Sequence, residues 1–176
     1  MNTEPFETML TGGHPNSLGR TVEVVDIVLE NPSKLEELFN CYFSSDEVVR
    51  LRTSNALKRV SREHPEWLVP YLDRLLTDIA GIDQASTQWT LANLFETLAR
   101  FMTPEQKASA TGVLKTNLTT HGDWIVLKNT TQTLGEWAQD DTELREWLVP
   151  QLERLSQDER KTVANTARKY HKRLSD

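Results

Sequence analysis

Apolar residues recur at helical spacing along most of the chain. Leu35, Leu38, Phe39 and Tyr42 are separated by three, one and three residues, so they fall on one face of a helix. The segment 21–29 is rich in valine, but its apolar positions also follow a helical face. No run with the two-residue period of a strand competes with these patterns. The hydrophobic pattern therefore predicts an all-helical chain.

Capping signals and spacing place nine helices. Three helix starts have the spacing of a capping box, in which two side chains satisfy first-turn amides. These pairs are Ser44 with Glu47, Thr103 with Gln106, and Ser156 with Glu159; Asn31-Pro32 supplies a further cap. The predicted helices span 16–30, 32–43, 45–63, 65–79, 84–101, 103–119, 122–139, 141–156 and 158–174. We expect residues 1–15 to be a flexible N-terminal segment and 16–176 to be a single helical-repeat domain.

The chain contains an internal repeat. Segment 66–75 recurs as 146–155, with eight of ten positions identical, including the run Glu-Trp-Leu-Val-Pro, at an offset of 80 residues. This offset is twice the length of common two-helix repeats, so the other helices should show the single period. Leu57 aligns with Phe95 and then with Leu134, at offsets of 38 and 39 residues. We therefore expect about four helix pairs.

These helices resemble the HEAT-repeat, or armadillo-like, superfamily over residues 31–174. The similar features are first helices interrupted by Pro70 and Pro150, and a second helix that opens with Asp46-x-x-Val49-Arg50 and continues to Ala56-Leu57. The resemblance implies a right-handed α-α superhelix, or solenoid, with an N-terminal capping helix and with the second helices on the concave face. It implies a role in holding another macromolecule and no particular catalytic residue. Each proline should kink its helix.

Two conspicuous segments have structural explanations. Trp67 and Trp147 hold equivalent positions in two repeats, so we expect them to pack in the core or on a ridge. The glycine-rich segment 12–20 lacks a phosphate-binding fingerprint. We expect it to cap the first helix through Asn16 or Ser17, or to cover the N-terminal end of the repeats.

Composition excludes several kinds of site. The net charge of −6 and pI near 5.3 argue against bulk nucleic-acid affinity. Cys41 is the only cysteine, so no intramolecular disulfide or Cys-rich zinc site can form, and it is expected to be a packed residue. The four histidines lie apart, which argues against a metal site or a catalytic triad. Without a signal peptide or membrane anchor, we predict a cytoplasmic protein with no cofactor and no catalytic site.

Charge is unevenly distributed among the predicted helices. Segments 45–63 and 158–174 have an excess of Lys and Arg, the second helices between them are mainly polar, and the first helices are richer in acid. A face formed by the second helices would therefore have basic ends and a polar middle. The candidate partner-binding residues are Arg50, Arg52, Arg59, Gln88, Asn93, Asn129, Gln132, Arg168 and Lys172. The alternative is that the basic residues only complement helix dipoles or are solvated.

The leading functional prediction is a non-catalytic interaction scaffold or adaptor that presents its second-helix face to a protein or peptide, including one with an acidic segment. The alternative is a nucleic-acid-binding protein resembling the helical-repeat DNA alkylation-repair glycosylases, favoured by the basic ends but opposed by the acidic total charge. A third alternative is an accessory subunit resembling the phycobilin lyases, although no residue indicates a chromophore pocket. The sequence leaves the partner and the oligomeric state open.

Overall fold

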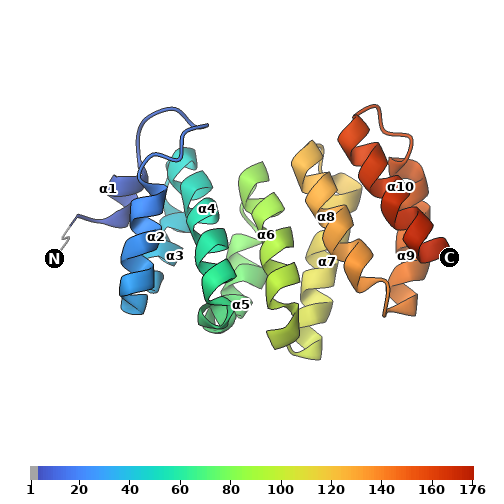
Figure 1. The fold of residues 1–176 in the computed structure, drawn as a ribbon, viewed down its shortest axis with the longest axis horizontal. Coiled ribbons are helices and arrows are strands. Elements are labelled where there is room, and N and C mark those ends of the chain that lie inside the picture. Colours follow the sequence, from blue (N-terminus) through green and yellow to red (C-terminus); the bar gives the residue numbers. More distant parts are fainter. Residues whose placement is uncertain (1–3) are drawn as a thin grey trace. The chain divides into compact units, whose positions relative to one another are not determined.

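Helices follow one another with short connections in the computed structural model, which describes residues 4–176 (Figure 1). This part of the chain contains no strand, so the predicted all-helical class is confirmed. The residues group into two compact units, 1–90 and 91–176, and α6 (Ala85–Leu98) begins in the first unit and ends in the second. Each of the nine predicted helical segments contains helix.

The first unit is organised around α4 (Glu47–Glu63), which packs against the helices before it. Its elements are α1 (Phe6–Leu10), α2 (Thr21–Glu30), a 3-10 turn (Pro32–Lys34), α3 (Leu35–Asn40), a second 3-10 turn (Cys41–Phe43), α4, a 3-10 helix (Pro65–Tyr71), α5 (Leu72–Arg74) and a π-helical turn (Leu75–Ile79). Val49, Thr53, Leu57 and Val60 are fully buried on α4, at the three- and four-residue spacings of an inward helical face. This face is the core of the first unit.

The N-terminal region contains one helix that the sequence pattern did not indicate. Residues 6–10 form α1 inside the segment expected to be flexible, and three of its side chains are buried because α1 packs on α2, α3 and α4. The three are Phe6, Met9 and Leu10. The loop 11–20 follows, and α2 begins only at Thr21 without a side-chain cap. The prediction that Asn16 or Ser17 caps it is therefore wrong.

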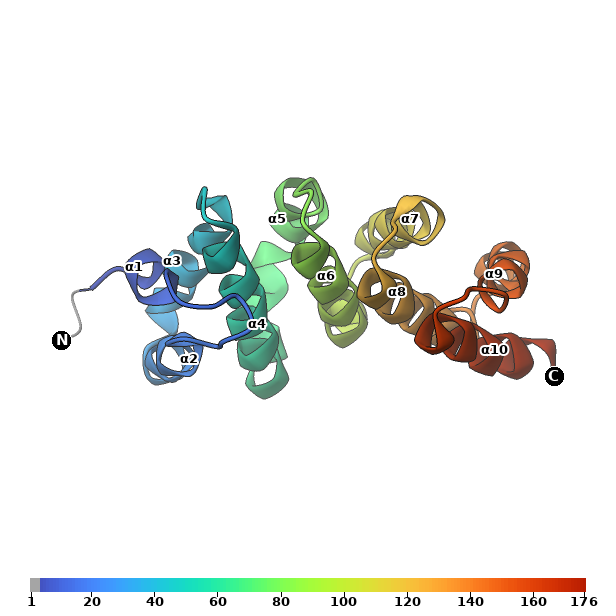
Figure 2. The same ribbon diagram turned by 90° about the horizontal axis from the view of Figure 1, so that it is seen from above.

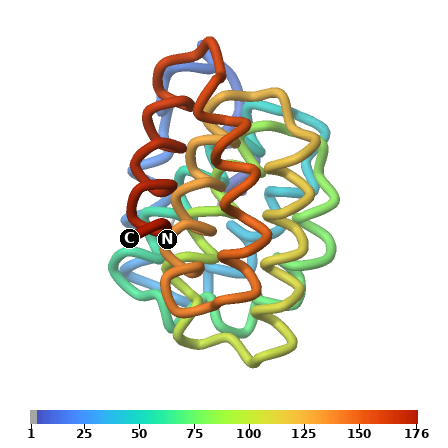
Figure 3. The backbone as a smooth tube through the Cα atoms, turned by 90° about the vertical axis from the view of Figure 1, so that its right-hand side faces the viewer, coloured from blue at the N-terminus to red at the C-terminus, as the bar shows by residue number. Residues whose placement is uncertain are grey.

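The second unit has two layers of helices. After a 3-10 turn (Ala99–Phe101) come α7 (Pro104–Thr120), α8 (Trp124–Trp137), α9 (Thr142–Leu155) and α10 (Lys161–Ser175). In this unit α8 and α10 pack side by side, with α7 and α9 in the other layer (Figure 2). Figure 3 views the C-terminal end, where α9 and α10 lie in contact nearest the viewer. The layers correspond to the second and first helices of the predicted pairs.

The helix starts agree only in part with the predicted caps. Thr103 and Gln106 form the predicted capping box at the start of α7. The other two predicted boxes are wrong. Asp46 rather than Ser44 caps α4, through a 2.8 Å hydrogen bond from a first-turn amide. At the other position α10 begins at Lys161 with no side-chain cap.

The two copies of Glu-Trp-Leu-Val-Pro have different backbone conformations. In the second copy Pro150 lies inside the continuous helix α9, whereas in the first copy Pro70 lies in the 3-10 helix that starts at Pro65. Proline has no backbone N–H, so an α-helix beginning at Pro65 would lack one of its first intrahelical hydrogen bonds, the one from residue 70. The first turn is the least favourable step of helix formation, so this loss is costly there. In α9 a full turn precedes the repeated segment. The core positions are nonetheless the same: Leu68, Leu72 and Leu75 are buried, as are Leu148, Leu152 and Leu155.

The repeated tryptophans are half-buried and lie outside the core of their units. Trp67 stacks on His64 with ring centroids 4.0 Å apart. The ammonium of Lys115 lies 4.8 Å from the ring centroid of Trp147. Both indoles therefore have a flat partner or a cation at the surface, which is consistent with a ridge position rather than a core position.

The contact between α8 and α10 depends on a glycine. A Cβ atom added at Gly135 would lie 2.3 Å from Cδ1 of Tyr170, which is far inside van der Waals contact. Tyr170 is 2% exposed, so its ring cannot move aside without disturbing the core. The absence of a side chain at Gly135 thus allows the two helices to pack closely.

We expect Gly135→Ala to destabilise the protein by about 1–3 kcal/mol, since overpacking of a filled core outweighs the gain in helix propensity. Gly112→Ala on α7 is the matched control, because a Cβ there meets nothing within 4 Å. This control should gain up to about 1 kcal/mol. Urea unfolding followed by circular dichroism measures both changes, and equal stabilities of the two variants would contradict the proposed packing role.

Candidate functional site

The nine residues predicted to contact a partner fall into three groups. Two are buried, three are hydrogen-bonded within their own unit, and four are at least partly exposed at the surface. The buried pair is Arg52 and Gln88, the bonded group is Arg50, Arg59 and Arg168, and the surface group is Asn93, Asn129, Gln132 and Lys172.

Arg52 is 2% exposed and holds the N-terminal loop in place. Its Nη1 donates to the carbonyl oxygens of Leu10 at 2.7 Å and Gly12 at 2.6 Å. Its Nε and Nη2 donate to two further loop carbonyls, of Ser17 and His14, at 3.2 and 3.3 Å. These carbonyl dipoles stabilise the buried guanidinium without a carboxylate. The prediction that Arg52 contacts a partner is therefore wrong, because its donors face the protein's own loop.

A second contact explains why the loop approaches Arg52 so closely. Gly19 has a φ of +51°, and a Cβ there would lie 2.9 Å from Cζ of Arg52. Glycine is needed both for the left-handed backbone conformation and for space. The glycine-rich segment is thus a loop shaped around one arginine, which agrees with the absence of a phosphate-binding fingerprint.

Gln88 and Arg50 also serve the first unit internally. Gln88 is 5% exposed, and its Nε2 donates to the carbonyls of Ala80 at 3.2 Å and Ile82 at 2.7 Å. Arg50 Nε donates to Gln84 Oε1 at 2.6 Å. The prediction for Gln88 is wrong for the same reason as for Arg52. The side-chain amide of Gln88 stabilises the turn before α6 and is not accessible to a partner.

The remaining basic side chains of α4 lie close together near its C-terminal end. Arg59 Nε donates to Asn55 Oδ1 at 2.7 Å, and its guanidinium stays partly exposed. Burial lowers the pKa of Lys58, and the charges of Arg62 and Arg59 lower it further. The predicted basic end of this helix therefore comprises these three cations rather than Arg50 and Arg52.

In the second unit, a hydrogen bond joins α6 to α8. The hydroxyl of Thr133 is buried and donates to the carbonyl of Ala92 at 2.9 Å. Asn93 and Gln132 are the sequence neighbours of these two residues, and both are half-exposed. Neither side-chain amide forms a hydrogen bond within residues 4–176. The two helices thus present two side-chain amides at the surface whose hydrogen-bonding groups could pair with another molecule.

A charged network links α8 to α10 beside these amides. Tyr170 donates its hydroxyl to Glu136 Oε1 at 2.7 Å, and Arg173 Nη1 donates to the same oxygen at 2.8 Å. Gln139 Nε2 donates to Glu136 Oε2 at 2.7 Å. The hydrogen bond from Tyr170, followed by that from Arg173, holds the pKa of Glu136 below its ordinary value. Arg173 is therefore neutralised within the unit.

Glu96 on α6 lies near this network without a cation of its own. Its Oε2 is 3.4 Å from the Thr133 hydroxyl, which makes its shorter bond to a backbone carbonyl. Burial raises the pKa of Glu96; the Thr133 hydroxyl opposes this shift and the Glu136 carboxylate adds to it. No ion pair involves Glu96 among residues 4–176. The surface around the amides is thus acidic on the α6 side.

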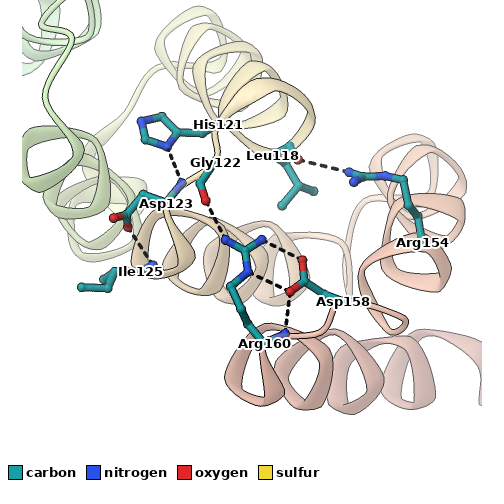
Figure 4. Close-up of polar contacts among 8 residues, drawn as sticks. All are labelled: Leu118, His121, Gly122, Asp123, Ile125, Arg154, Asp158 and Arg160. Carbon is teal, nitrogen blue, oxygen red and sulfur yellow. Dashed lines mark hydrogen bonds and ion pairs between the residues drawn. The ribbon is translucent and has the colours of Figure 1, made fainter.

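The connection before α10 is held by arginines (Figure 4). Arg160 pairs with Asp158 at 2.7 Å and donates from Nη1 to the carbonyl of Gly122 at 2.6 Å. Hydrogen bonds from Arg160 lower the pKa of Asp158 to about 2. Arg154 donates to the carbonyl of Leu118 at 3.2 Å. These two arginines join the α9–α10 region to the last turn of α7 and to the connection that follows it, so their donors are directed at the protein itself.

The same close-up shows how α8 begins. Asp123 accepts a 2.8 Å hydrogen bond from Ile125 N and so caps the helix (Figure 4). His121 Nδ1 accepts a 3.1 Å hydrogen bond from Asp123 N. Each polar side chain in this turn therefore has a local structural role.

Cys41 and the possible metal-binding side chains bear on catalytic and metal chemistry. Burial, followed by the charges of Glu7 and Glu37, raises the pKa of Cys41 to about 12, so its thiol is a poor nucleophile. Residues 4–176 include no group of three or more His, Cys, Asp or Glu side chains arranged to hold a metal ion. Within the same range, no helix combines the length and apolar character needed to cross a bilayer. Comparisons with family models, curated proteins and solved structures give no match.

We expect Arg52→Met to destabilise the protein by about 1.5–3 kcal/mol, since it removes charge-assisted hydrogen bonds to three loop carbonyls and to the carbonyl of Leu10 at the end of α1. Cleavage of the loop 11–20 by protease should also become faster. Arg62→Met, at an exposed position on the same helix, is the control and should change stability by less than about 0.5 kcal/mol. Unchanged unfolding and proteolysis in the Arg52 variant would show that the loop is held by other contacts.

Glu96→Gln should stabilise the protein at neutral pH. Because the folded-state pKa of Glu96 is raised, the native state prefers the protonated form, and the wild type loses stability as pH rises from the unfolded pKa through the folded value. The gain in the variant should be below about 1 kcal/mol, since the group is partly solvated, and should shrink towards pH 4. Glu146→Gln, at an exposed position on α9, is the control. Urea unfolding at several pH values tests the expected trend.

Proposed function

We propose that this chain is a HEAT-like helical-repeat protein, a solenoid of about four helix pairs, that acts as a non-catalytic scaffold or adaptor. The period of 38 to 39 residues and the buried leucines at equivalent positions of segments 66–75 and 146–155 support the class. Repeat proteins of this kind bind macromolecules along surfaces formed by successive repeats.

The main support for the proposal is a pair of side-chain amides that form no hydrogen bond within residues 4–176. They lie on α6 and α8, the second helices of two consecutive predicted pairs. Asn93 and Gln132 lie 39 residues apart, one repeat period, and the bond from Thr133 to the carbonyl of Ala92 keeps their helices in register. A side-chain amide has both donors and an acceptor, so it can pair with a peptide group whatever the peptide's side chains. We call Asn93 and Gln132 the amide surface. Its chemistry favours a protein or peptide partner.

A nucleic-acid partner has less support from the same surface. Two predicted arginines, Arg50 and Arg52, direct donors to the protein itself. The carboxylate of Glu96, which forms no ion pair among residues 4–176, lies beside the amide surface and would repel phosphates. The net charge of −6 acts in the same direction at low salt.

The proposed setting is the cytoplasm, where thiols are kept reduced. Cys41 is buried and unpaired, which is compatible with such a compartment. Neither a cofactor nor a catalytic residue is part of the proposal.

The amide surface can be tested with the double variant Asn93→Ala/Gln132→Ala in a cross-linking capture experiment from the native extract. If each lost amide removes about 1 kcal/mol of binding, capture of the specific partner should fall by a factor of about 10 or more. Ser109→Ala/Thr116→Ala is the matched control, because these exposed hydroxyl residues lie on α7 in the other layer. Equal capture by the wild type and the amide variant would refute the proposed surface.

A further inference from the structure

The last helix of the second unit, α10, has an unusual charge pattern. Between Lys161 and Ser175 it contains five Lys and Arg residues and no Asp or Glu. The five are Lys161, Arg168, Lys169, Lys172 and Arg173. Its opposite face is apolar, with Val163, Ala167 and Tyr170 buried against the neighbouring helices. The basic residues are therefore concentrated on the solvent side of an amphipathic helix.

Four of the five charges have no acidic partner. Arg173 pairs with Glu136, as described above. Arg168 donates to neutral acceptors, the carbonyl of Ser156 at 2.7 Å and Asn165 Oδ1 at 3.2 Å, so its charge is not compensated. Lys169 lies 5.2 Å from the ring centroid of Tyr170. Within residues 4–176, the remaining two lysines of α10 form no ion pair.

The uncompensated cations lie along one side of α10. Lys161, Arg168 and Lys172 follow the spacing i, i+7 and i+11, which places them on one face of the helix, and Lys169 lies beside them. All four are exposed. With a rise of 1.5 Å per residue the stripe is roughly 16 Å long. Figure 3 shows the path of α10 at the C-terminal end of the second unit. We call these four residues the basic stripe.

Helix stability does not explain the basic stripe. A cation complements the helix dipole only in the last turn, which accounts for Lys172, but Lys161 occupies the first turn, where a positive charge is unfavourable. Arg168 and Lys172 are four residues apart, as are Lys169 and Arg173, and like charges at this spacing weaken a helix. The arrangement thus lowers the intrinsic stability of α10, and an external anion would relieve this repulsion.

We propose that the basic stripe docks an acidic segment of the protein partner, a proposal that rests on the proposed scaffold function. An extended chain advances about 3.3 Å per residue, so roughly five residues rich in Asp and Glu span the stripe. Glu153 on α9 contacts His171 on one side of the stripe, and the ion pair between Glu136 of α8 and Arg173 lies on the other. A narrow cationic stripe between carboxylates suits a single peptide chain better than the wider phosphate surface of a nucleic-acid duplex.

The test uses the full chain and a fluorescein-labelled peptide of alternating Glu and Gly with six glutamates, titrated by fluorescence anisotropy at low salt. Lys169→Gln/Lys172→Gln should weaken binding at least tenfold. Arg62→Gln/Arg100→Gln is the matched control, since it removes the same charge from exposed positions on other helices. It should leave the affinity within about twofold. Higher salt should weaken binding to the wild type, because the contacts are exposed charges.

The proposal would be overturned by no binding of the glutamate peptide at low salt, by equal weakening by both double variants, or by tighter stripe-dependent binding of duplex DNA of equal charge. The amide variant Asn93→Ala/Gln132→Ala separates this inference from the scaffold proposal. It should keep its affinity for the glutamate peptide, while it loses the native partner. If Lys169→Gln/Lys172→Gln lost the native partner but still bound the glutamate peptide as tightly as the wild type, the peptide would bind elsewhere on the protein and the proposal would fail. Because Lys169 and Lys172 are exposed, their variants should fold, which circular dichroism can verify.

Discussion

Helices of this protein bury an apolar face against neighbouring helices in the fold, and the rest of the structure depends on that contact. In the second unit the closest case is the approach of α10 to α8, where the ring of Tyr170 occupies the space left by Gly135. Close packing at this point brings the Tyr170 hydroxyl within 2.7 Å of Glu136. Core packing therefore also determines which surface charges are neutralised.

Many polar side chains that look available in the sequence are used for the protein's own connections. Arg52 holds the N-terminal loop, Gln88 holds the turn before α6, and Arg160 joins two connections of the second unit. The backbone carbonyls of loops and helix ends need donors, and arginine supplies several in one side chain. A count of basic residues thus overestimates the charge that a partner can meet.

The two surfaces proposed for binding differ in chemistry. The amide surface, represented by Asn93 and Gln132, is neutral and suits hydrogen bonds to a peptide backbone. The basic stripe on α10 suits carboxylates and is limited on either side by Glu136 and Glu153. A partner that contacted both surfaces would gain affinity from the amide surface whatever its sequence. The basic stripe would then select partners that contain an acidic segment.

The sequence by itself determined the helical class, the approximate helix boundaries and the repeat, because apolar spacing directly reflects which face of a helix is buried. Of the residues that it indicated for partner binding, Asn93 and Gln132 are half-exposed and Lys172 is exposed. It did not reveal that the two Glu-Trp-Leu-Val-Pro segments differ in backbone conformation, since this depends on how much helix precedes each proline. Nor did it show that Arg52 is buried, because its four carbonyl partners lie 35 to 42 residues away and meet it only in the folded chain. Local spacing fixes secondary structure, whereas the availability of a polar group depends on distant segments that only the tertiary structure brings together.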